Sequence, residues 1–447
     1  MVRRNVFVYV GLALFSIWTV GTWYLTSYPV SLSQMPSIDD RIHTIELQVK
    51  KVEEAIESQR ASNHMLLKIL QKRQDAQKGG QTQADEVGST DAPLLQLPTE
   101  PIAVLVFACN RSQAIKNHVD QLLRLRPSKE RFPIIVSQDC DDAKTTQTVL
   151  DYGDQVKLIH QPDQRAIDPP KKLRKFLGYY KIARHYRWAL NETFFQMGYN
   201  AVIITEDDLE ISSDFFEYFT ATWPLLQIDS TLMCVSAWND NGKANLVEKD
   251  PKRLWRTDFF PGLGWMLTKT MWEELNEKWP EAFWDDWLRN PEQRKQRSCV
   301  RPEVPRTAMS THGKVGVSRG LFFDKHLKHI ALNRDPVKFT QMDLSYLLKD
   351  KYDPLFVGEV YGGPSITQKE LREGKLQNGE PLPKAVRLTY EEKNTYKTTA
   401  KAFGLMDDFR AGVPRMAYRG VVAFMYGPTR VFLAPPSNWQ NYDPNWN

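Results

Sequence analysis

Short apolar runs alternate with longer amphipathic stretches through the middle of the chain. Two of these stretches, residues 112–125 and 173–190, predict helices, and the first carries its apolar residues on one face. Runs rich in β-branched residues predict five strands, at residues 102–108, 133–137, 156–159, 201–205 and 232–237. Strands that alternate with helices indicate an α/β fold with a parallel sheet.

The alternation weakens after about residue 333. Residues 421–426 and 431–433 are apolar, and the segment Gly427-Pro428-Thr429-Arg430 between them predicts a β-hairpin. We therefore expect a main α/β domain followed by a smaller α+β domain with antiparallel strands. The expected boundaries are 101–311 for the main domain, 312–347 for a linker and 348–447 for the smaller domain.

The N-terminus carries an apolar stretch after two arginines, Arg3 and Arg4. Residues 5–25 contain no charged side chain, and about 20 apolar residues are needed to span a bilayer. The stretch predicts a transmembrane signal anchor behind a cytoplasmic tail at residues 1–4, with a cleaved signal peptide as the alternative. Because basic residues favour the cytoplasmic side, the remainder of the chain is expected outside the cytoplasm.

The stretch between the anchor and the main domain, residues 26–100, has the character of a stem. Within it, apolar residues recur with 4-3 spacing over about five heptads at 38–73, which predicts a coiled coil. Asn63 lies in the apolar seam and favours a parallel dimer, whereas a single amphipathic helix is the alternative. Residues 74–100 are rich in Gln, Gly, Asp and Ser, which is typical of a flexible linker.

Charge and cysteine usage narrow the function classes. The formal charge of +5 is small for 447 residues, and no nucleic-acid-reading motif occurs, so we expect no nucleic-acid partner. The four cysteines have no C-x-x-C spacing, which argues against a metal site of that type. An even number in a chain outside the cytoplasm is compatible with two disulfides, and spacing leaves all three pairings open.

Three acidic residues, Glu206, Asp207 and Asp208, directly follow the predicted strand at 201–205. Carboxylates at the C-terminal edge of a strand lie where open α/β sheets bind ligands. Clustered carboxylates repel one another unless a cation joins them, and hard oxygen ligands suit Mg²⁺ or Mn²⁺ on nucleotide phosphates. The segment predicts a metal-diphosphate site, and a solvated acidic loop is the alternative.

A second acidic segment, Asp285-Asp286, is flanked by aromatic residues in the run Phe283-Trp284-Asp285-Asp286-Trp287. Aromatic faces can serve as platforms for sugars, and apolar walls can raise a carboxyl pKa towards the range of a general base. The alternative is an amphipathic patch whose tryptophans pack in the core.

Three further residues are candidates for binding a nucleotide. Asp139 follows the strand at 133–137 and can hold a ribose or base edge, or cap the next helix. Arg111 follows the first strand, where it can face a phosphate or uracil, or pair with a carboxylate. His185 lies in a predicted helix, where a structural role is the alternative. Residues 314–320 form a basic, glycine-containing loop that can close over a diphosphate.

Six segments together resemble the N-acetylglucosaminyltransferase I family. The resemblance covers essentially all of residues 101–447, whereas the anchor and stem resemble the family only in layout. The segments are 132–140 (FPIIVSQDC), 178–190 (GYYKIARHYRWAL), 206–209 (EDDL), 234–243 (CVSAWNDNGK), 256–265 (RTDFFPGLGW) and 282–287 (AFWDDW).

The resemblance implies a GT-A nucleotide-sugar fold in a Golgi membrane protein of type II topology. It implies an inverting transferase that uses UDP-GlcNAc and Mn²⁺. The acceptor is the α-1,3-linked mannose of a high-mannose N-glycan, which receives GlcNAc in β-1,2 linkage and so enters hybrid and complex N-glycan synthesis. Two alternatives stay open: a related transferase acting on O-mannose, and a non-catalytic Golgi lectin or tether.

The resemblance also assigns roles to individual residues. Asp208 matches the metal ligand and Asp285 the general base. The other matches are nucleotide-sugar contacts at Arg111, Asp139, His185, Glu206 and Asp207, a closing loop at Val317 and Ser318, and disulfides Cys109–Cys140 and Cys234–Cys299. Asn110 departs from the acidic residue expected there.

Overall fold

The computed structural model describes residues 95–316, 320 and 322–446. These residues belong to one compact unit, Thr90–Asn447. The expected anchor at 5–25, the coiled coil at 38–73 and most of the linker lie outside the described residues. Within the described part of the chain, no helix is both long enough and apolar enough to cross a bilayer.

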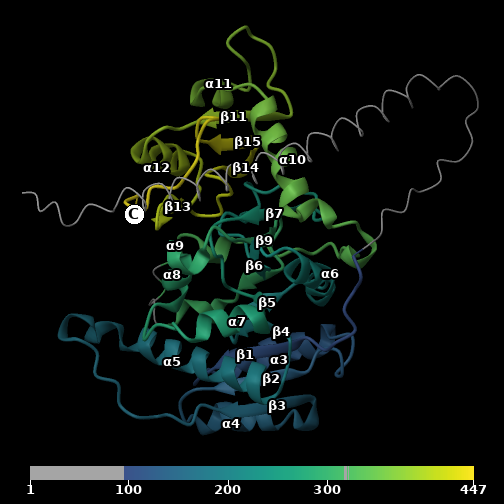
Figure 1. Ribbon diagram of the computed structural model, residues 1–447, viewed down its shortest axis with the longest axis vertical. Helices are drawn as coiled ribbons and strands as arrows, with labels where there is room; N and C mark the ends of the chain where they lie inside the picture. The colour runs from purple at the N-terminus through teal and green to yellow at the C-terminus, as the bar shows by residue number, and fades with distance from the viewer. Residues whose placement is uncertain (1–94, 317–319, 321, 447) are drawn as a thin grey trace, which may run out of the picture. The chain divides into compact units, whose positions relative to one another are not determined.

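An eight-stranded mixed sheet forms the centre of the fold, in the order β3-β2-β1-β4-β8-β6-β9-β7 (Figure 1). Four neighbouring strands run parallel, and β8 and β7 lie antiparallel to their neighbours. The strands are β1 (Ala103–Ala108), β2 (Ile134–Gln138), β3 (Val156–His160), β4 (Ala201–Glu206), β6 (Leu232–Ser236), β7 (Leu254–Thr257), β8 (Trp265–Thr268) and β9 (Ser298–Pro302). All five predicted strands are therefore confirmed, and all five run in the same direction, as expected; the antiparallel strands β7 and β8 were not predicted.

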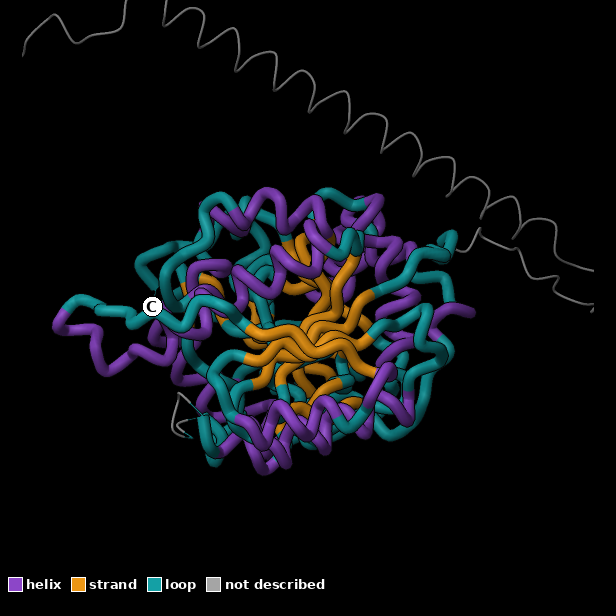
Figure 2. Tube along the Cα trace, turned by 90° about the horizontal axis from the view of Figure 1, so that it is seen from below, coloured by secondary structure: helices purple, strands orange, loops and turns teal. Residues whose placement is uncertain are grey.

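Helices cover both faces of this sheet, and Figure 2 shows the strands between two helical layers. Alternate residues of β1 explain why both faces are apolar: Val104 and Val106 belong to one buried cluster, Leu105 and Phe107 to the other. The helices are α3 (Ser112–Leu125), α4 (Ala143–Leu150), α5 (Leu177–Asn191), α6 (Phe215–Ile228), α7 (Lys269–Asn276), and the short α8 (Trp284–Arg289) and α9 (Pro291–Arg294). The predicted helix at 112–125 is confirmed, and the one predicted at 173–190 begins as a 3₁₀ turn at Lys171–Phe176.

The C-terminal part has its own three-stranded sheet, in the order β11-β15-β14, and its own buried apolar cluster. The predicted hairpin is confirmed as the antiparallel pair β14–β15, while β11 pairs parallel to β15. These elements are α10 (Lys349–Gly362), α11 (Gln368–Glu373), β11 (Ala385–Thr389), α12 (Lys393–Ala402), β12 (Phe409–Arg410), β13 (Val413–Pro414), β14 (Val422–Tyr426) and β15 (Thr429–Ala434).

Both disulfides implied by the resemblance are present. Cys109–Cys140 joins the chain just after β1 to the chain just after β2, and Cys234–Cys299 joins the neighbouring strands β6 and β9. Their Cα atoms lie 5.4 and 4.7 Å apart, within the range that a disulfide bridges. The first disulfide holds together the two loops that carry Arg111 and Asp139.

A two-stranded ribbon, β5 (Leu209–Ile211) with β10 (Thr307–Met309), projects from the end of β4. A buried ion pair fixes its far end. Asp214 Oδ2 accepts from Arg306 Nε and Nη2 at 3.2 and 3.1 Å and from Asn333 Nδ2 at 3.1 Å. The Asp214 and Arg306 side chains are 1% and 0% exposed.

We expect Asp214→Ala to lower the free energy of unfolding by about 3–5 kcal/mol, because it leaves the buried Arg306 charge without a partner. Chemical denaturation of the full chain measures this change. As a matched control, Asp154→Ala removes an exposed pair with Lys129 and should leave the unfolding midpoint nearly unchanged. Equal midpoints for the two variants would contradict a structural role for the Asp214–Arg306 pair.

Candidate functional site

The acidic segment forms the turn between β4 and β5, at the C-terminal end of a parallel strand. Asp207 and Asp208 are buried, at 3% and 7% exposure, and Glu206 is half-buried. Backbone hydrogen bonds hold the turn: Asp207 N–H donates to Phe107 O at 3.1 Å, and Ser310 N–H donates to Asp208 O at 2.8 Å. The solvated-loop alternative is therefore wrong.

Arg111 belongs to the loop that follows β1, and its side chain contacts the acidic turn. Its Nη1 donates to Asp208 Oδ2 at 2.8 Å and its Nε to Asp207 Oδ2 at 3.2 Å, and Nη2 also bonds to Asp207 Oδ1. The same Nη1 donates to the carbonyls of His312 and Val315, at 3.3 and 3.0 Å. Arg111 thus joins the acidic turn to the segment that precedes residues 317–319.

Burial raises the pKa of both Glu206 and Asp207 to about 7. The charge of Asp208 adds to the rise at both groups, while Arg111 opposes it. Such crowding of carboxyl groups favours the binding of a cation.

The turn fits the chemistry of a hard metal ion at one atom in particular. Asp208 Oδ1 is buried and has no hydrogen-bond partner among the described residues, so it is a carboxylate oxygen available to a cation. No group of three or more His, Cys, Asp or Glu side chains in the described residues is arranged to hold a metal.

Tyr186 of α5 connects the acidic turn to the second acidic segment. Its hydroxyl donates to Glu206 Oε1 at 2.8 Å, and its ring stacks on Phe107 at 3.7 Å and on Trp284 at 4.4 Å. Burial raises the pKa of Tyr186 well above its usual value, and the charges of Glu206, Asp285 and Asp208 add to the rise. The two acidic segments, 77 residues apart in the sequence (Asp285 minus Asp208), therefore both border one tyrosine.

The second acidic segment lies in the first turn of α8. Asp285 Oδ2 accepts from Arg289 Nη1 at 2.9 Å, and its side chain is 42% exposed. Asp286 Oδ1 accepts from Arg289 at 2.8 Å and from Arg410 at 2.9 Å. Burial alone would raise the pKa of Asp286, but the two arginines outweigh it and lower that pKa. Asp286 is thus held by two cations, and Asp285 keeps one carboxylate oxygen free of hydrogen bonds.

The tryptophans of this segment pack against other tryptophans. Trp284 is 8% exposed and stacks on Trp265 and Trp279 at 5.9 and 5.7 Å. Trp287 packs against Trp279 at 5.7 Å. The alternative, in which the tryptophans pack in the core, is the one that the structure bears out.

His185 and Asp139 border the same sheet edge on the side of β2. His185 Nε2 shares a hydrogen bond with Ser137 Oγ at 2.7 Å, and Asp139 Oδ1 accepts from Gln164 Nε2 at 3.0 Å. Burial lowers the pKa of His185 to about 4; Asp139 opposes this shift, and Arg184 reinforces it. The imidazole is therefore neutral, and the hydrogen bond to Ser137 holds its ring in place.

We expect the His185 imidazole to stay neutral from pH 8 down to about pH 5. Its folded pKa lies below the unfolded value of about 6.5, so the unfolded chain binds the extra proton. The free energy of unfolding should therefore fall as the pH drops from about 6.5 towards 4. Denaturant unfolding across this range, with NMR of the ring, measures both effects, and His185→Gln should reduce the loss. A His185 ring that titrates near 6.5 would contradict this expectation.

The structure brings Arg111, Asp207 and Asp208 into one cluster, and Glu206 bonds to Tyr186, whose pKa the charge of Asp285 also raises. Tyr186 and Arg289 were not singled out from the sequence. Val317 and Ser318 lie outside the described residues. Aromatic residues on a helix usually pack in the core. The only sequence signal for Tyr186 was its place next to His185.

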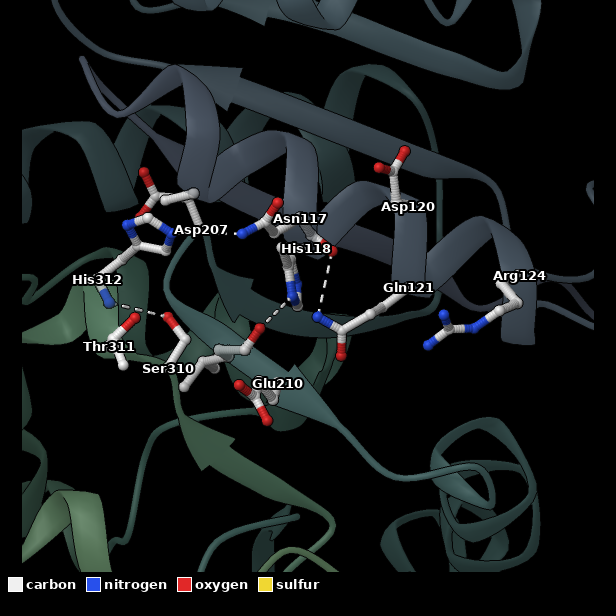
Figure 3. Close-up of a pocket in the computed structure, with 12 residues that line it drawn as sticks. Asn117, His118, Asp120, Gln121, Arg124, Asp207, Glu210, Ser310, Thr311 and His312 are labelled. Atoms are coloured by element: carbon white, nitrogen blue, oxygen red, sulfur yellow. Dashed lines mark hydrogen bonds between the residues drawn. The ribbon is translucent and has the colours of Figure 1, made fainter.

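A polar cavity of about 420 Å³ lies behind the acidic turn, between α3 and the β5–β10 ribbon. Side chains from both elements meet across it, and Asp207 forms part of its wall (Figure 3). His118 is buried here, where its ring bonds to Leu209 O at 2.7 Å and to Thr205 Oγ1 at 2.9 Å. His118 therefore bonds to the chain on both sides of the acidic turn.

The mixed sheet with helices on both faces and an acidic turn at the C-terminal end of a parallel strand define a ligand-binding protein of the α/β class. Comparison with known proteins gives the family. The model of the GNT-I family matches residues 3–446. The chain is also 39% identical over 350 residues to the alpha-1,3-mannosyl-glycoprotein 2-beta-N-acetylglucosaminyltransferase of Arabidopsis thaliana, covering 78% of this chain and 77% of the relative. The chain belongs to the GNT-I family.

Solved structures are similar only at low identity. A mannosyltransferase of Pyrobaculum calidifontis, in complex with GDP-Man and Mn²⁺, is 15% identical with a TM-score of 0.28, covering 39% of this chain and 46% of that one. The S. aureus protein TarS, residues 1–349, is 13% identical with a TM-score of 0.32, covering 60% of this chain and 76% of that one. TM-scores this low support no detailed argument.

Proposed function

We propose that this protein transfers GlcNAc from UDP-GlcNAc to the α-1,3-linked mannose of a high-mannose N-glycan, forming a β-1,2 linkage with inversion at the anomeric carbon. Family membership and the name of the Arabidopsis relative support the reaction. The observation that carries it is that Tyr186 contacts both acidic segments, through its hydrogen bond to Glu206 and its stacking on Trp284, the residue before Asp285. A single displacement needs positive charge at the leaving group and a base on the opposite side of the sugar.

The donor end is the acidic turn of a GT-A-type fold. Asp208 Oδ1 would hold the metal ion, which we take to be Mn²⁺ and which supplies positive charge to the diphosphate. Glu206 and Asp207 would bind the nucleotide sugar beside it, and His185 and Asp139 would contact the nucleoside at the β2 edge. Arg111, which now pairs with the turn, provides a guanidinium for the phosphates once a metal competes for the carboxylates. Val317 and Ser318 would close over the nucleotide.

The acceptor end is the first turn of α8. Asp285 takes the proton from the attacking mannose hydroxyl as its oxygen bonds to the anomeric carbon and the bond to UDP breaks. Arg289 bonds to only one oxygen of Asp285, so the other oxygen is free for the acceptor. Because the carboxylate side chain is 42% exposed, a glycan can reach it from solvent.

The setting of the enzyme is part of the proposal. We propose a single-pass type II protein of the Golgi membrane, anchored by residues 5–25, with the described residues on the lumenal side. The two disulfides accord with an oxidising compartment. A coiled coil at 38–73 would make the stem a homodimer.

A transfer assay tests the reaction. The full chain, with UDP-GlcNAc and Mn²⁺, is offered a high-mannose glycopeptide and, separately, an O-mannosyl peptide. We expect β-1,2-linked GlcNAc on the glycopeptide alone, and linkage analysis of the product checks the bond. Transfer to the O-mannosyl peptide alone would support the related O-mannose enzyme. Glycopeptide binding without any transfer would support the lectin alternative.

A further inference from the structure

Three partly exposed aromatic rings gather beside the acidic end of α8. Phe283 directly precedes this helix, and its ring stacks on Tyr179 with centroids 4.8 Å apart at 26°. Phe176 meets both rings edge-on, at 5.5 Å from Phe283 and 6.0 Å from Tyr179. All three side chains keep some exposure, unlike the buried Trp284. We refer to Phe176, Tyr179 and Phe283 as the aromatic cluster.

The aromatic cluster lies against the carboxylates of α8. Phe283 is two residues from Asp285, and Tyr179 is close enough that its pKa, raised first by burial, is raised further by the charges of Asp285 and Asp286. The cluster therefore offers flat, partly exposed rings and the Tyr179 hydroxyl near the carboxylates of α8.

The backbone of Phe283, one member of the cluster, is strained. Phe283 has φ of 53°, in the left-handed region that bulky side chains rarely adopt. Strain of this kind persists where the surrounding structure enforces it, and it collects at binding and catalytic sites. Here the stacking on Tyr179 and the edge contact with Phe176 accompany the strained turn.

We propose that the aromatic cluster is the acceptor subsite, where a sugar ring of a mannose-terminated glycan lies on Tyr179 and Phe283. This inference rests on the proposed function. A sugar ring presents C–H groups on its face and hydroxyls on its edge, so it needs apolar surface below and a few placed polar groups around it. The cluster supplies the surface, and the Tyr179 hydroxyl and Asp285 supply the polar groups. The donor turn contacts Tyr186 through Glu206, whereas the cluster adjoins α8 through Phe283, so the acceptor would approach from the α8 side.

Steady-state kinetics of the full chain with three leucine variants test the subsite. Tyr179→Leu, Phe176→Leu and Phe283→Leu keep apolar volume but remove the flat ring. We expect each to raise the KM for a high-mannose glycopeptide by about tenfold or more, as loss of an aromatic anchor does. The KM for UDP-GlcNAc should stay within about twofold, because the donor turn is untouched. Tyr179→Phe, which loses only the hydroxyl, should cause a smaller rise.

Phe195→Leu is the matched control, since Phe195 is a 39% exposed phenylalanine in the turn that follows the other end of α5. It should leave both KM values unchanged. If the strained Phe283 position does not tolerate leucine, the Tyr179 and Phe176 variants carry the test. An acceptor KM that stays near the wild-type value in those variants, or a donor KM that rises equally, would overturn the subsite. A wild-type chain without transfer would instead overturn the proposed function.

Discussion

Asp285→Asn should reduce turnover by about 10²–10⁴-fold, the usual contribution of a positioned general base. The amide has nearly the shape of the carboxylate and can still accept from Arg289, so α8 should keep its structure. It cannot take a proton from the mannose hydroxyl. Affinity for UDP-GlcNAc should be unchanged, because the donor turn is a separate segment between β4 and β5. Single-turnover kinetics and calorimetry of UDP binding measure the two quantities separately.

The neighbouring carboxylate, Asp286, is the control for the assignment of Asp285 as the base. Asp286 shares the same helix turn and also bonds to Arg289, but Arg410 holds it as well. Asp286→Asn should therefore affect stability more than the chemical step, with a loss of turnover far smaller than that of Asp285→Asn. The reverse order of the two losses would move the base to Asp286. Near-normal turnover in both variants would remove α8 from the mechanism.

The local pattern of the sequence was sufficient for the strands that carry the site. Runs such as 201–205 are buried on both faces, so they are apolar throughout and end abruptly at the first carboxylate. The alternation with helices also gave the common direction of the five predicted strands, but the antiparallel β7 and β8 were missed. The strand β8 pairs antiparallel with both β4 and β6, and nothing in its four residues distinguishes it from a parallel strand. Direction depends on how the intervening chain returns to the sheet.

Side-chain partners between distant segments were also beyond the sequence pattern. The tryptophans of α8 looked like a sugar platform because their contacts with Trp265 and Trp279 form only on folding. The half-exposed rings that adjoin Asp285 come from Phe176 and Tyr179, more than 100 residues earlier in the chain. Arg111 was expected to face either a ligand or a carboxylate, and its pairing with Asp207 and Asp208 required both loops to be placed.

Removal of the Asp208 carboxylate should have the second large effect. Asp208→Ala takes away Oδ1, the buried oxygen without a partner, and leaves Arg111 to pair with Asp207 alone. Loss of an outer-shell partner of a metal site typically costs 10–100-fold in affinity, so loss of the ligand itself should cost at least about 100-fold. We expect metal-dependent UDP binding to weaken by that factor in calorimetry, and Mn²⁺ binding in the presence of UDP to weaken likewise in electron paramagnetic resonance.

Glu210→Ala separates this effect from general loss of negative charge. Glu210 lies two residues away and is exposed on β5, so its removal changes the net charge equally but leaves the buried turn intact. It should bind UDP and metal as the wild type does. Equal weakening in the two variants would mean that the turn attracts the metal only through its overall charge. Unchanged binding in Asp208→Ala would refute the metal role of Asp208, and the proposed donor site would then have to be built on Glu206 and Asp207, whose carboxyl pKa values near 7 leave them only partly ionised at neutral pH.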